Sequence, residues 1–381
     1  MRDAVERYVS RLLAESTPQA PVWNVERMRS GAAAHWNYID GCMLRALLRL
    51  GGVRNDARYA AFCKDFLAYY VLADGSLRGY DEASYNLDNI CEGNALIDLY
   101  AMTGEERYLR AIERLQGQLL RQPRTLEGSF WHKLIYPNQV WLDGLYMAQV
   151  FRLRRANLLE SCEYDDILLQ FQTVRKRMYD PATRLYRHGY DASGKAFWAD
   201  ERGLSACVWL RAMGWWVAAL ADAAAEWPET HAGKAWLRDC LVEALSGLLA
   251  YRDADSGMFF QVVDQGSRAG NYPETSGTAL AAYACLRGYN GGALGERFRD
   301  AGLSLLRAIE ENKLEEHDGR LSLTGICLVA GLGPEDNERR DGSFDYYISE
   351  PVVCDEAKGV APFLMAYAEA AAIGEAETHA G

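Results

Sequence analysis

The feature that most constrains the fold of this chain is an alternation between two kinds of predicted helix. One kind is amphipathic, and the other is rich in Gly, Ala and aromatic residues around its whole circumference. An amphipathic helix covers a core with one face, whereas a helix that is apolar all round is buried. The amphipathic segments are 3–14, 56–73, 105–121, 160–179, 232–251 and 294–312, and the buried segments are 35–50, 87–100, 137–151, 205–224, 275–288 and 357–371.

Roughly six buried helices alternating with roughly six amphipathic ones indicate helical hairpins that close into an inner ring inside an outer ring. The sequence therefore predicts an all-α fold, an α/α barrel. A chain of 381 residues would otherwise be expected to form two domains, but a closed barrel allows 1–381 to be one domain. Short β-type runs at 183–190, 196–198 and 258–263 predict hairpin-like loops at one mouth of the barrel.

Charge and cysteine usage exclude several classes of protein. The formal net charge of −12 argues against a nucleic-acid partner, whose phosphates require basic contacts. No segment has the length and apolarity of a membrane span, and the N-terminus lacks the apolar run of a signal peptide. Nine cysteines without CxxC spacing indicate reduced structural thiols rather than a disulfide scaffold or a zinc site. We therefore expect a cytoplasmic monomer or homodimer without a metal or cofactor.

The buried segment 137–151 contains one carboxylate, Asp143. Pro137 suits the first turn of a helix, where its missing N–H leaves no bond unmade. On such a helix, the residues three and four positions from Asp143 include no Lys or Arg that could pair with it. A buried carboxylate without a partner is costly and tends to take up a proton. Such a residue is either satisfied by a distant partner or retained for chemistry, and we favour chemistry.

Other polar and aromatic residues stand at, or just before, the N-terminal ends of the buried segments. In an inner ring of parallel helices these ends converge on one mouth of the barrel, which makes them candidates for a common site. With Asp143, the candidates are Tyr38, Asp88, His132, Lys133, Trp141, His188, Trp209, Arg211 and Trp215.

Each of these candidates also has a structural alternative. Asp88 could cap a helix, which is a common role for Asp. His132 and Lys133 could lie in a solvated loop, and His188 could be a satisfied core or loop histidine. Arg211 could pair with an outer carboxylate, but its helix is mostly apolar, which favours an inward role.

Five stretches of the chain carry a family resemblance, in order and over nearly the whole length. They are 140–147, 209–215, 261–264, 271–277 and 344–364, within a span from about His35 to Phe363. Together they resemble glycoside hydrolase family 105, the unsaturated rhamnogalacturonyl hydrolases. One departure is Ala212, where many members of the family have Gly; it bears on the shape of the pocket and leaves Trp209 and Arg211 in place.

The resemblance implies an (α/α)6 barrel, in agreement with the helix alternation. It also implies a substrate class, the short pectin-derived oligosaccharides that a polysaccharide lyase leaves with a 4,5-unsaturated uronic acid at the non-reducing end. The family hydrates the C4=C5 double bond instead of attacking the anomeric carbon, so the carboxylate spacing of retaining and inverting enzymes does not apply. By this resemblance Asp143 would be the general acid and base, and Asp88 would couple to it and position the sugar or the water.

The resemblance also divides the binding residues into groups. Arg211, with His132 and Lys133, would hold the uronate carboxylate. His188 is a further substrate-binding candidate, and no metal or cofactor is implied. The walls of the pocket would be formed by Tyr38, Trp141, Trp209 and Trp215.

Other functions remain open at this point. The related family 88 of unsaturated glucuronyl hydrolases has the same barrel and chemistry with glycosaminoglycan-type substrates, but the stretch 344–364 favours family 105. Within family 105, ulvan-type glucuronides are an alternative substrate. An epimerase on a similar barrel would depend on inner-ring histidines, and the chain has only six His. A catalytically silent sugar-binding protein would have little reason to retain Asp143.

Overall fold

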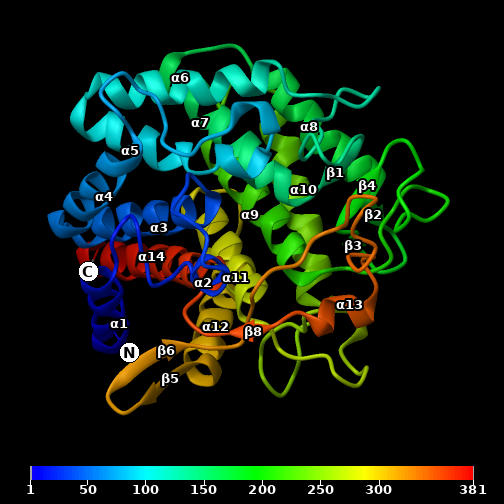
Figure 1. Cartoon of the computed structure of the whole chain (residues 1–381). Helices are drawn as coiled ribbons and strands as arrows, with labels where there is room; N and C mark the ends of the chain where they lie inside the picture. The colour runs from blue at the N-terminus through cyan, green and yellow to red at the C-terminus, as the bar shows by residue number, and fades with distance from the viewer. Residues whose placement is uncertain (1, 381) are drawn as a thin grey trace.

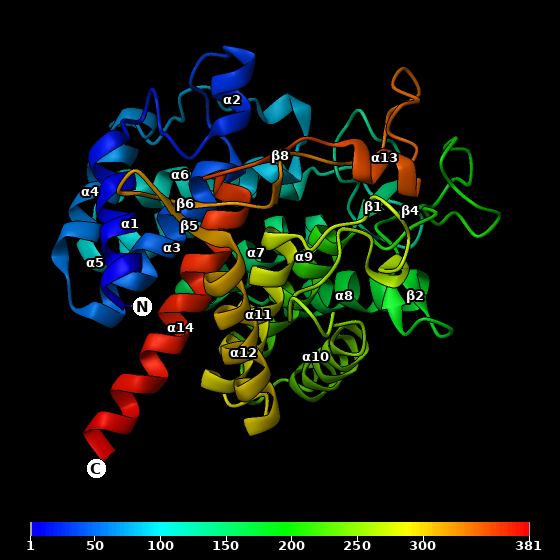
Figure 2. The same cartoon turned by 90° about the horizontal axis from the view of Figure 1, so that it is seen from below.

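The fold is a double ring of helices, seen here in a computed structural model that describes residues 2–380, with side chains from residue 3 to residue 374. In this part of the chain each inner helix packs on the next, and α14 packs back on α3 to close the ring (Figure 1, Figure 2). The inner helices are α3 (Tyr38–Arg54), α5 (Gly93–Thr103), the π-helical turn η3 (Leu145–Gln149) with α7 (Val150–Leu159), α9 (Leu210–Glu226), α11 (Thr275–Asn290) and α14 (Ala357–Ala380).

The outer helices turn an apolar stripe towards this ring. In α6, for example, Tyr108, Ile112 and Leu115 are buried while the charged face is exposed. The predicted alternation of buried and amphipathic helices is therefore confirmed, and so is the α/α barrel. The outer helices are α1 (Arg2–Glu15), α4 (Ala57–Tyr70), α6 (Glu106–Leu120), α8 (Tyr164–Met178), α10 (Gly233–Leu249) and α12 (Glu296–Lys313).

Glycines allow the inner helices to approach one another closely. A Cβ added to Gly41 of α3 would lie 2.4 Å from the Cα of Glu92, just before α5. A Cβ added to Gly277 of α11 would lie 2.8 Å from the carbonyl carbon of Leu210, the first residue of α9. No side chain fits at either position without moving backbone, because real Cβ atoms do not approach backbone so closely.

Short antiparallel strand pairs decorate the ring. The predicted β-type run 183–190 is confirmed in part by β3 and β4, whereas 258–263 makes isolated bridges through Phe260 and Val262 instead of a strand. The pairs in the second half of the chain were not predicted. The paired strands are β1 (Gln139–Trp141) with β4 (Gly189–Asp191), β2 (Tyr179–Asp180) with β3 (Leu185–Tyr186), β5 (Leu314–His317) with β6 (Arg320–Leu323), and β7 (Ile326–Cys327) with β8 (Val352–Val353).

The prediction of a helix from Pro137 onward is wrong. Asn138 has a left-handed backbone (φ 62°), strand β1 follows it, and the helix begins only at Asp143. The backbone of β1 is paired with β4, and Leu142 N–H donates to the His188 carbonyl (3.1 Å). A fully buried strand and a fully buried helix are both apolar on all sides, so the hydrophobic pattern could not separate them. Asp143 therefore stands in a first helical turn, at the mouth of the barrel.

Short helices lie in the segments that connect the helices of the two rings. They are α2 (Val25–Ser30), α13 (Phe344–Ser349) and the 3-10 turns η1 (Glu82–Ser84), η2 (Leu87–Ile90) and η4 (Val263–Gln265).

The nine cysteines are free thiols and seven of them are buried, as predicted for structural thiols. Within residues 2–380, no helix combines the length and apolarity needed to cross a membrane.

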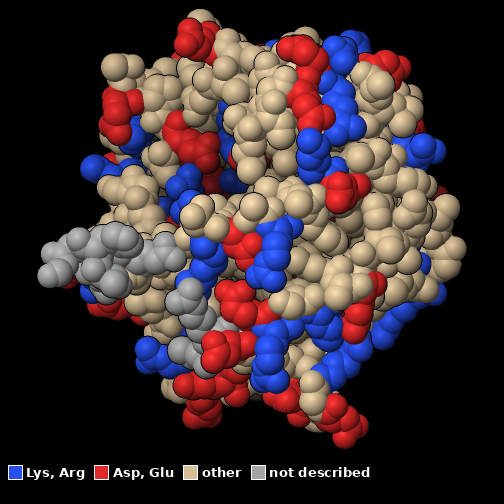
Figure 3. Space-filling view, turned by 90° about the vertical axis from the view of Figure 1, so that its left-hand side faces the viewer, with Lys and Arg blue, Asp and Glu red and all other residues tan. Residues whose placement is uncertain are grey.

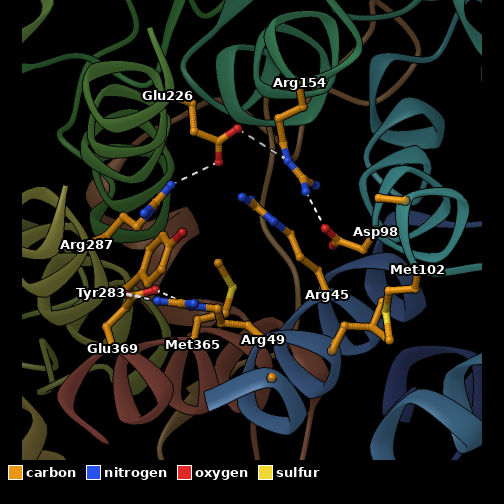
Figure 4. A pocket seen from close by; sticks show the side chains of 13 residues that line it. Arg45, Arg49, Asp98, Met102, Arg154, Glu226, Tyr283, Arg287, Met365 and Glu369 are labelled. Carbon is orange, nitrogen blue, oxygen red and sulfur yellow. Dashed lines mark hydrogen bonds and ion pairs between the residues drawn. The ribbon is translucent and has the colours of Figure 1, made fainter. Parts of the chain in front are cut away.

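The C-terminal ends of the inner helices meet at the end of the barrel opposite Asp143. They surround a cavity of about 370 Å³ in which arginines and carboxylates alternate (Figure 4). Figure 3 faces this side of the molecule, where red and blue atoms line a recess. Arg45 and Arg287 both contact the buried Asp222, at 2.9 and 3.1 Å. Cations near helix C-termini are favoured by the helix dipole, which suits arginines at this position.

Candidate active site

The N-terminal ends of the inner helices carry the predicted site residues. Tyr38 opens α3, Asp88 lies on η2 just before α5, and Asp143 begins the helix that continues into α7. Trp209 is the residue before α9, and Arg211 is its second residue. The N-termini of the ring thus bring to one mouth residues that are far apart in the sequence.

Asp88 is held by a neighbouring lysine and a neighbouring histidine. Its carboxylate lies 2.7 Å from Lys133 Nζ and 3.4 Å from His132 Nε2. Leu87 N–H donates to the His132 carbonyl (3.1 Å), which fixes the two segments against each other. Burial alone would raise the pKa of Asp88, but Lys133 and His132 outweigh it and hold the pKa below its ordinary value. Asp88 is therefore a carboxylate in the unliganded site, and it is not a helix cap, since Asn86 caps η2.

His132 contacts Asp88 and packs against the residue that follows Asp143. Its Nε2 faces Asp88, and its Nδ1 lies 3.3 Å from the position that a Cβ on Gly144 would occupy, directly beside Asp143. Nδ1 has no hydrogen-bond partner among the described residues. Burial lowers the pKa of His132 to about 4, against the opposing pull of Asp88. His132 is therefore neutral at pH 7 and gives the site a polar, uncharged group next to Asp88.

Asp143 finds a partner from a distant part of the chain. Its Oδ2 lies 3.4 Å from His188 Nε2, and the Nδ1 of His188 is hydrogen-bonded to the Tyr347 hydroxyl (2.7 Å). The Asp143–His188 contact lacks hydrogen-bond geometry, and neither atom has another partner among the described residues. Asp143 is 9% exposed. Both groups therefore keep hydrogen-bonding capacity for a ligand.

Aromatic rings enclose these polar groups. Trp141 stacks on His132 with ring centroids 4.4 Å apart and on Tyr136 at 4.7 Å. The ring of Trp209 packs on His188, with ring centroids 4.8 Å apart, and it stacks on Tyr347. Flat aromatic faces beside carboxylates suit a sugar ring, which has apolar faces and polar edges.

Arg211 and Trp215 lie deeper than predicted. Arg211 is fully buried, with Nε donating to Ser276 Oγ (2.7 Å) and a terminal nitrogen donating to the Cys327 carbonyl, and it lies 3.7 Å from Glu274. Its other terminal nitrogen, Nη1, has no partner among the described residues. Trp215 is enclosed in the barrel core against Tyr146 (4.6 Å), so the structure does not bring it to the mouth.

A cavity of about 210 Å³ opens beside Asp88 and Lys133. The half-buried Tyr38 contributes to its lining, and its role as a wall of the substrate pocket stays a prediction. In residues 2–380, no group of three or more His, Cys, Asp or Glu side chains is arranged to hold a metal ion. The cavity is lined by Asn24, Glu26, Arg27, Ser30, Ala32, His35, Asn37, Tyr38, Ile39, Asn86, Asp88, Asn89 and Lys133.

Three residues near the site were not among the predicted ones. Tyr347 orients His188, Tyr136 extends the stack on Trp141, and Arg27 lines the cavity beside Asp88. Tyr347 lies within the stretch 344–364, so the family resemblance held a signal for it. Arg27 stands in a short polar segment without any pattern, and only its three-dimensional position identifies it.

Comparison with known proteins agrees with this geometry. The family model for Glycosyl Hydrolase Family 88 matches residues 14–373. Protein Atu3128 of Agrobacterium fabrum is 45% identical over 211 residues, which are 54% of this chain and 89% of that protein. The unsaturated rhamnogalacturonyl hydrolase YesR of Bacillus subtilis is 31% identical over 245 residues, 62% of this chain and 66% of that protein.

A solved structure is similar over almost the full length. A glycoside hydrolase from family 105 of C. acetobutylicum ATCC 824 superposes with a TM-score of 0.87 at 38% sequence identity. The alignment covers 95% of this chain and 99% of that one.

Proposed function

Because the chain belongs to the glycoside hydrolases described by the family 88 model, and is similar to a family 105 structure over its length, we propose that it acts on rhamnogalacturonan lyase products. It removes the 4,5-unsaturated uronic acid from their non-reducing end. The relative YesR bears the name of this activity, which supports the choice of substrate.

In the proposed reaction, Asp143 donates a proton to C4 of the alkene and then activates the water that adds to C5. The net change is the addition of one water across C4=C5, which creates a hemiketal at C5. Opening of this hemiketal breaks the ring, and the sugar attached at C1 leaves as an alcohol. General acid–base catalysis of this kind contributes about 10²- to 10⁴-fold to a rate.

The binding roles follow from the charges at the mouth. Asp88 and neutral His132 position the sugar and the water, while Lys133 contributes a positive charge close to the uronate. Trp141 and Trp209 form the walls, and His188 faces Asp143. Arg211 lies behind these groups as a buried positive charge, and it contributes to carboxylate binding through its charge.

One observation carries this proposal. A single neutral histidine contacts Asp88 with Nε2 and packs with Nδ1 against Gly144, the residue after Asp143, and an aromatic ring stacks on that histidine at 4.4 Å. An acid–base carboxylate, a second carboxylate and a stacking surface are what hydration of an unsaturated sugar ring requires. A silent binding protein would need only the stacking surface.

The test uses the ultraviolet absorbance of the unsaturated uronate, which hydration abolishes. We expect Asp143→Asn to lose at least about 10²-fold in kcat on a lyase-generated rhamnogalacturonan disaccharide, with an unchanged melting temperature. Asp336→Asn, an exposed carboxylate, is the matched control and should retain the wild-type rate. A wild-type rate for Asp143→Asn would exclude this assignment of the acid.

A substrate panel separates the proposed activity from its relatives. Unsaturated disaccharides from rhamnogalacturonan, chondroitin and ulvan present the same alkene next to different leaving sugars. We expect the highest kcat/KM on the rhamnogalacturonan product. A preference for the chondroitin product would instead assign the protein to the unsaturated glucuronyl hydrolases.

A further inference from the structure

Arg27 is a buried cation without a partner. It lines the cavity of about 210 Å³ that it shares with Asp88 and Lys133, and it is 8% exposed. Its Nε is fully enclosed without an acceptor. No hydrogen bond or ion pair joins its guanidinium to any residue in the described part of the chain; its hydrogen bonds are made by the backbone, with Asn24 and Ser30.

The other charged groups of the cavity each contact an opposite charge, and Glu26 shares its partner Lys358 with Glu356 (3.1 Å). Glu26 lies 2.6 Å from Lys358 Nζ, and Asp88 lies 2.7 Å from Lys133 Nζ. His35 lies at the exposed rim. The lining of the cavity therefore retains one positive charge that contact does not neutralise, and that charge belongs to Arg27.

Asp40, behind the cavity, acts on Arg27 only through space. Its two oxygens accept hydrogen bonds from Trp23 Nε1 and from Asn37 Nδ2, both at 2.8 Å. Burial raises the pKa of Asp40 to about 6, and these hydrogen bonds and Arg27 only partly oppose the rise. The negative charge of Asp40 is therefore lost in mildly acidic solution, whereas the guanidinium stays charged.

An unpaired buried guanidinium is costly for the fold, because burial removes its water and nothing replaces the lost hydrogen bonds. The position of Arg27 offers a functional reason for this cost. Its planar fork matches a carboxylate, and Asp88 lines the same cavity. A cavity of about 210 Å³ has room for one sugar ring. Asn86 and Asn89 also line it, and their amide groups can contact hydroxyl groups of a sugar.

We propose that Arg27 is a specificity-determining residue that binds the carboxylate of an acidic sugar in this cavity. The inference rests on the proposed function, because it takes the sugar acids of lyase products as ligands. The carboxylate has two possible sources, the unsaturated uronate itself or a second uronate further along the leaving chain. Either carboxylate would make the same contact with the Arg27 guanidinium, and substrates of different length distinguish the two sources.

The experiment compares Arg27→Gln and Arg27→Lys with Arg29→Gln, an exposed arginine two residues along the same segment. Each variant is assayed on an unsaturated disaccharide with one carboxylate and on a tetrasaccharide with two. We expect Arg27→Gln to lower kcat/KM at least 10-fold, mainly through KM, and Arg27→Lys to lower it less. Arg29→Gln should match the wild type.

The two substrates locate the carboxylate. A similar loss on both assigns Arg27 to the unsaturated uronate, and a loss on the tetrasaccharide alone assigns it to the leaving chain. Wild-type kcat/KM for Arg27→Gln on both substrates would overturn the proposal.

Two readouts separate this role from a structural one and from a failure of the proposed function. Arg27→Gln should melt at or above the wild-type temperature, because it removes an uncompensated buried charge, and a fall of several degrees would instead show a structural role. Galacturonate, but not galactose, should raise the melting temperature of the wild type and of Arg29→Gln, and should not raise that of Arg27→Gln. This binding test needs no turnover, so it stands even if no substrate is hydrated.

Discussion

A single histidine sets the electrostatics of the mouth. His132 contacts Asp88, adjoins Asp143 through Gly144 and stacks on Trp141. Burial lowers its pKa to about 4, so the ring stays neutral where a free histidine would begin to ionise. A charged ring at this place would pair with Asp88 and offset its negative charge.

This shift makes stability depend on pH in a defined window. The unfolded chain holds His132 at its ordinary pKa of 6.5 and takes up a proton there, whereas the folded chain does so only at about 4. The contribution is therefore fully present above pH 6.5 and is lost as the pH falls towards 4. We expect wild type, relative to His132→Gln, to lose about 2 kcal/mol of unfolding free energy between pH 7.5 and pH 5, measured by urea titration. Parallel pH profiles of the two proteins would contradict the shift.

The sequence identified Asp143 because no cation stands within one helical turn of it, and the partner that it does have, His188, comes from another element. It could not identify Arg27, since an arginine in a polar segment has no pattern that distinguishes a buried side chain from an exposed one. Arg211 was correctly predicted to point inward. Its contacts with Ser276 and the Cys327 carbonyl depend on how α9 and α11 pack, which a sequence pattern does not contain.

At the scale of the elements, small residues decide how the inner helices meet. Gly277 on α11 faces the backbone of Leu210 at the start of α9, next to the site. We expect Gly277→Ala to lower the unfolding free energy by about 1–3 kcal/mol, because the added methyl meets backbone that cannot move aside. Urea or thermal unfolding measures this loss.

Gly52 provides the matched control for that substitution. It lies in the inner helix α3 with nothing within 4 Å of an added Cβ. Alanine there should stabilise the protein by roughly 0.5–1 kcal/mol, since it favours the helix and meets no neighbour. If both variants were equally stable, close backbone packing would not be what the inner glycines provide.

Helix alternation was enough to predict the barrel, because the distribution of apolar residues around a helix indicates how deeply that helix is buried. The strands were harder: β1 is three residues long and fully buried, and its pairing with β4 depends on a loop about 50 residues further along. The π-helical turn that follows Asp143 leaves no mark in the hydrophobic pattern either. The sequence therefore predicts which helices line the ring but not where the Asp143 helix begins.

At the scale of the whole molecule, Asp222 ties three inner helices together at the end opposite the site. It accepts hydrogen bonds from Arg45 of α3 (2.9 Å) and from Arg287 (3.1 Å) and Tyr283 (2.7 Å) of α11. Burial alone would raise the pKa of Asp222, but Arg45 and Arg287 hold it below its ordinary value. Its carboxylate thus compensates two buried guanidinium groups at once.

Removing this charge should be costly. We expect Asp222→Asn to lower the unfolding free energy by about 3–5 kcal/mol, because the buried Arg45 loses its counter-charge and Arg287 keeps only Glu226. Asp239→Asn breaks an exposed pair with Arg238 and should cost less than about 1 kcal/mol. Denaturant titration of both variants checks the contrast, and a loss for Asp222→Asn as small as the control's would show that the network contributes little.

Between the two ends the barrel axis is filled, since Tyr146, Trp215 and Met365 are all buried there. The mouth is thus a blind pocket, and under the proposed function a polysaccharide can offer it only a chain terminus. A lyase cut creates one unsaturated terminus, and hydration leaves a saturated one that no longer reacts. Each lyase cut would therefore support a single turnover. The amount of product would then equal the number of cuts that the lyase has made. Further shortening of the chain would require a hydrolase that accepts saturated ends.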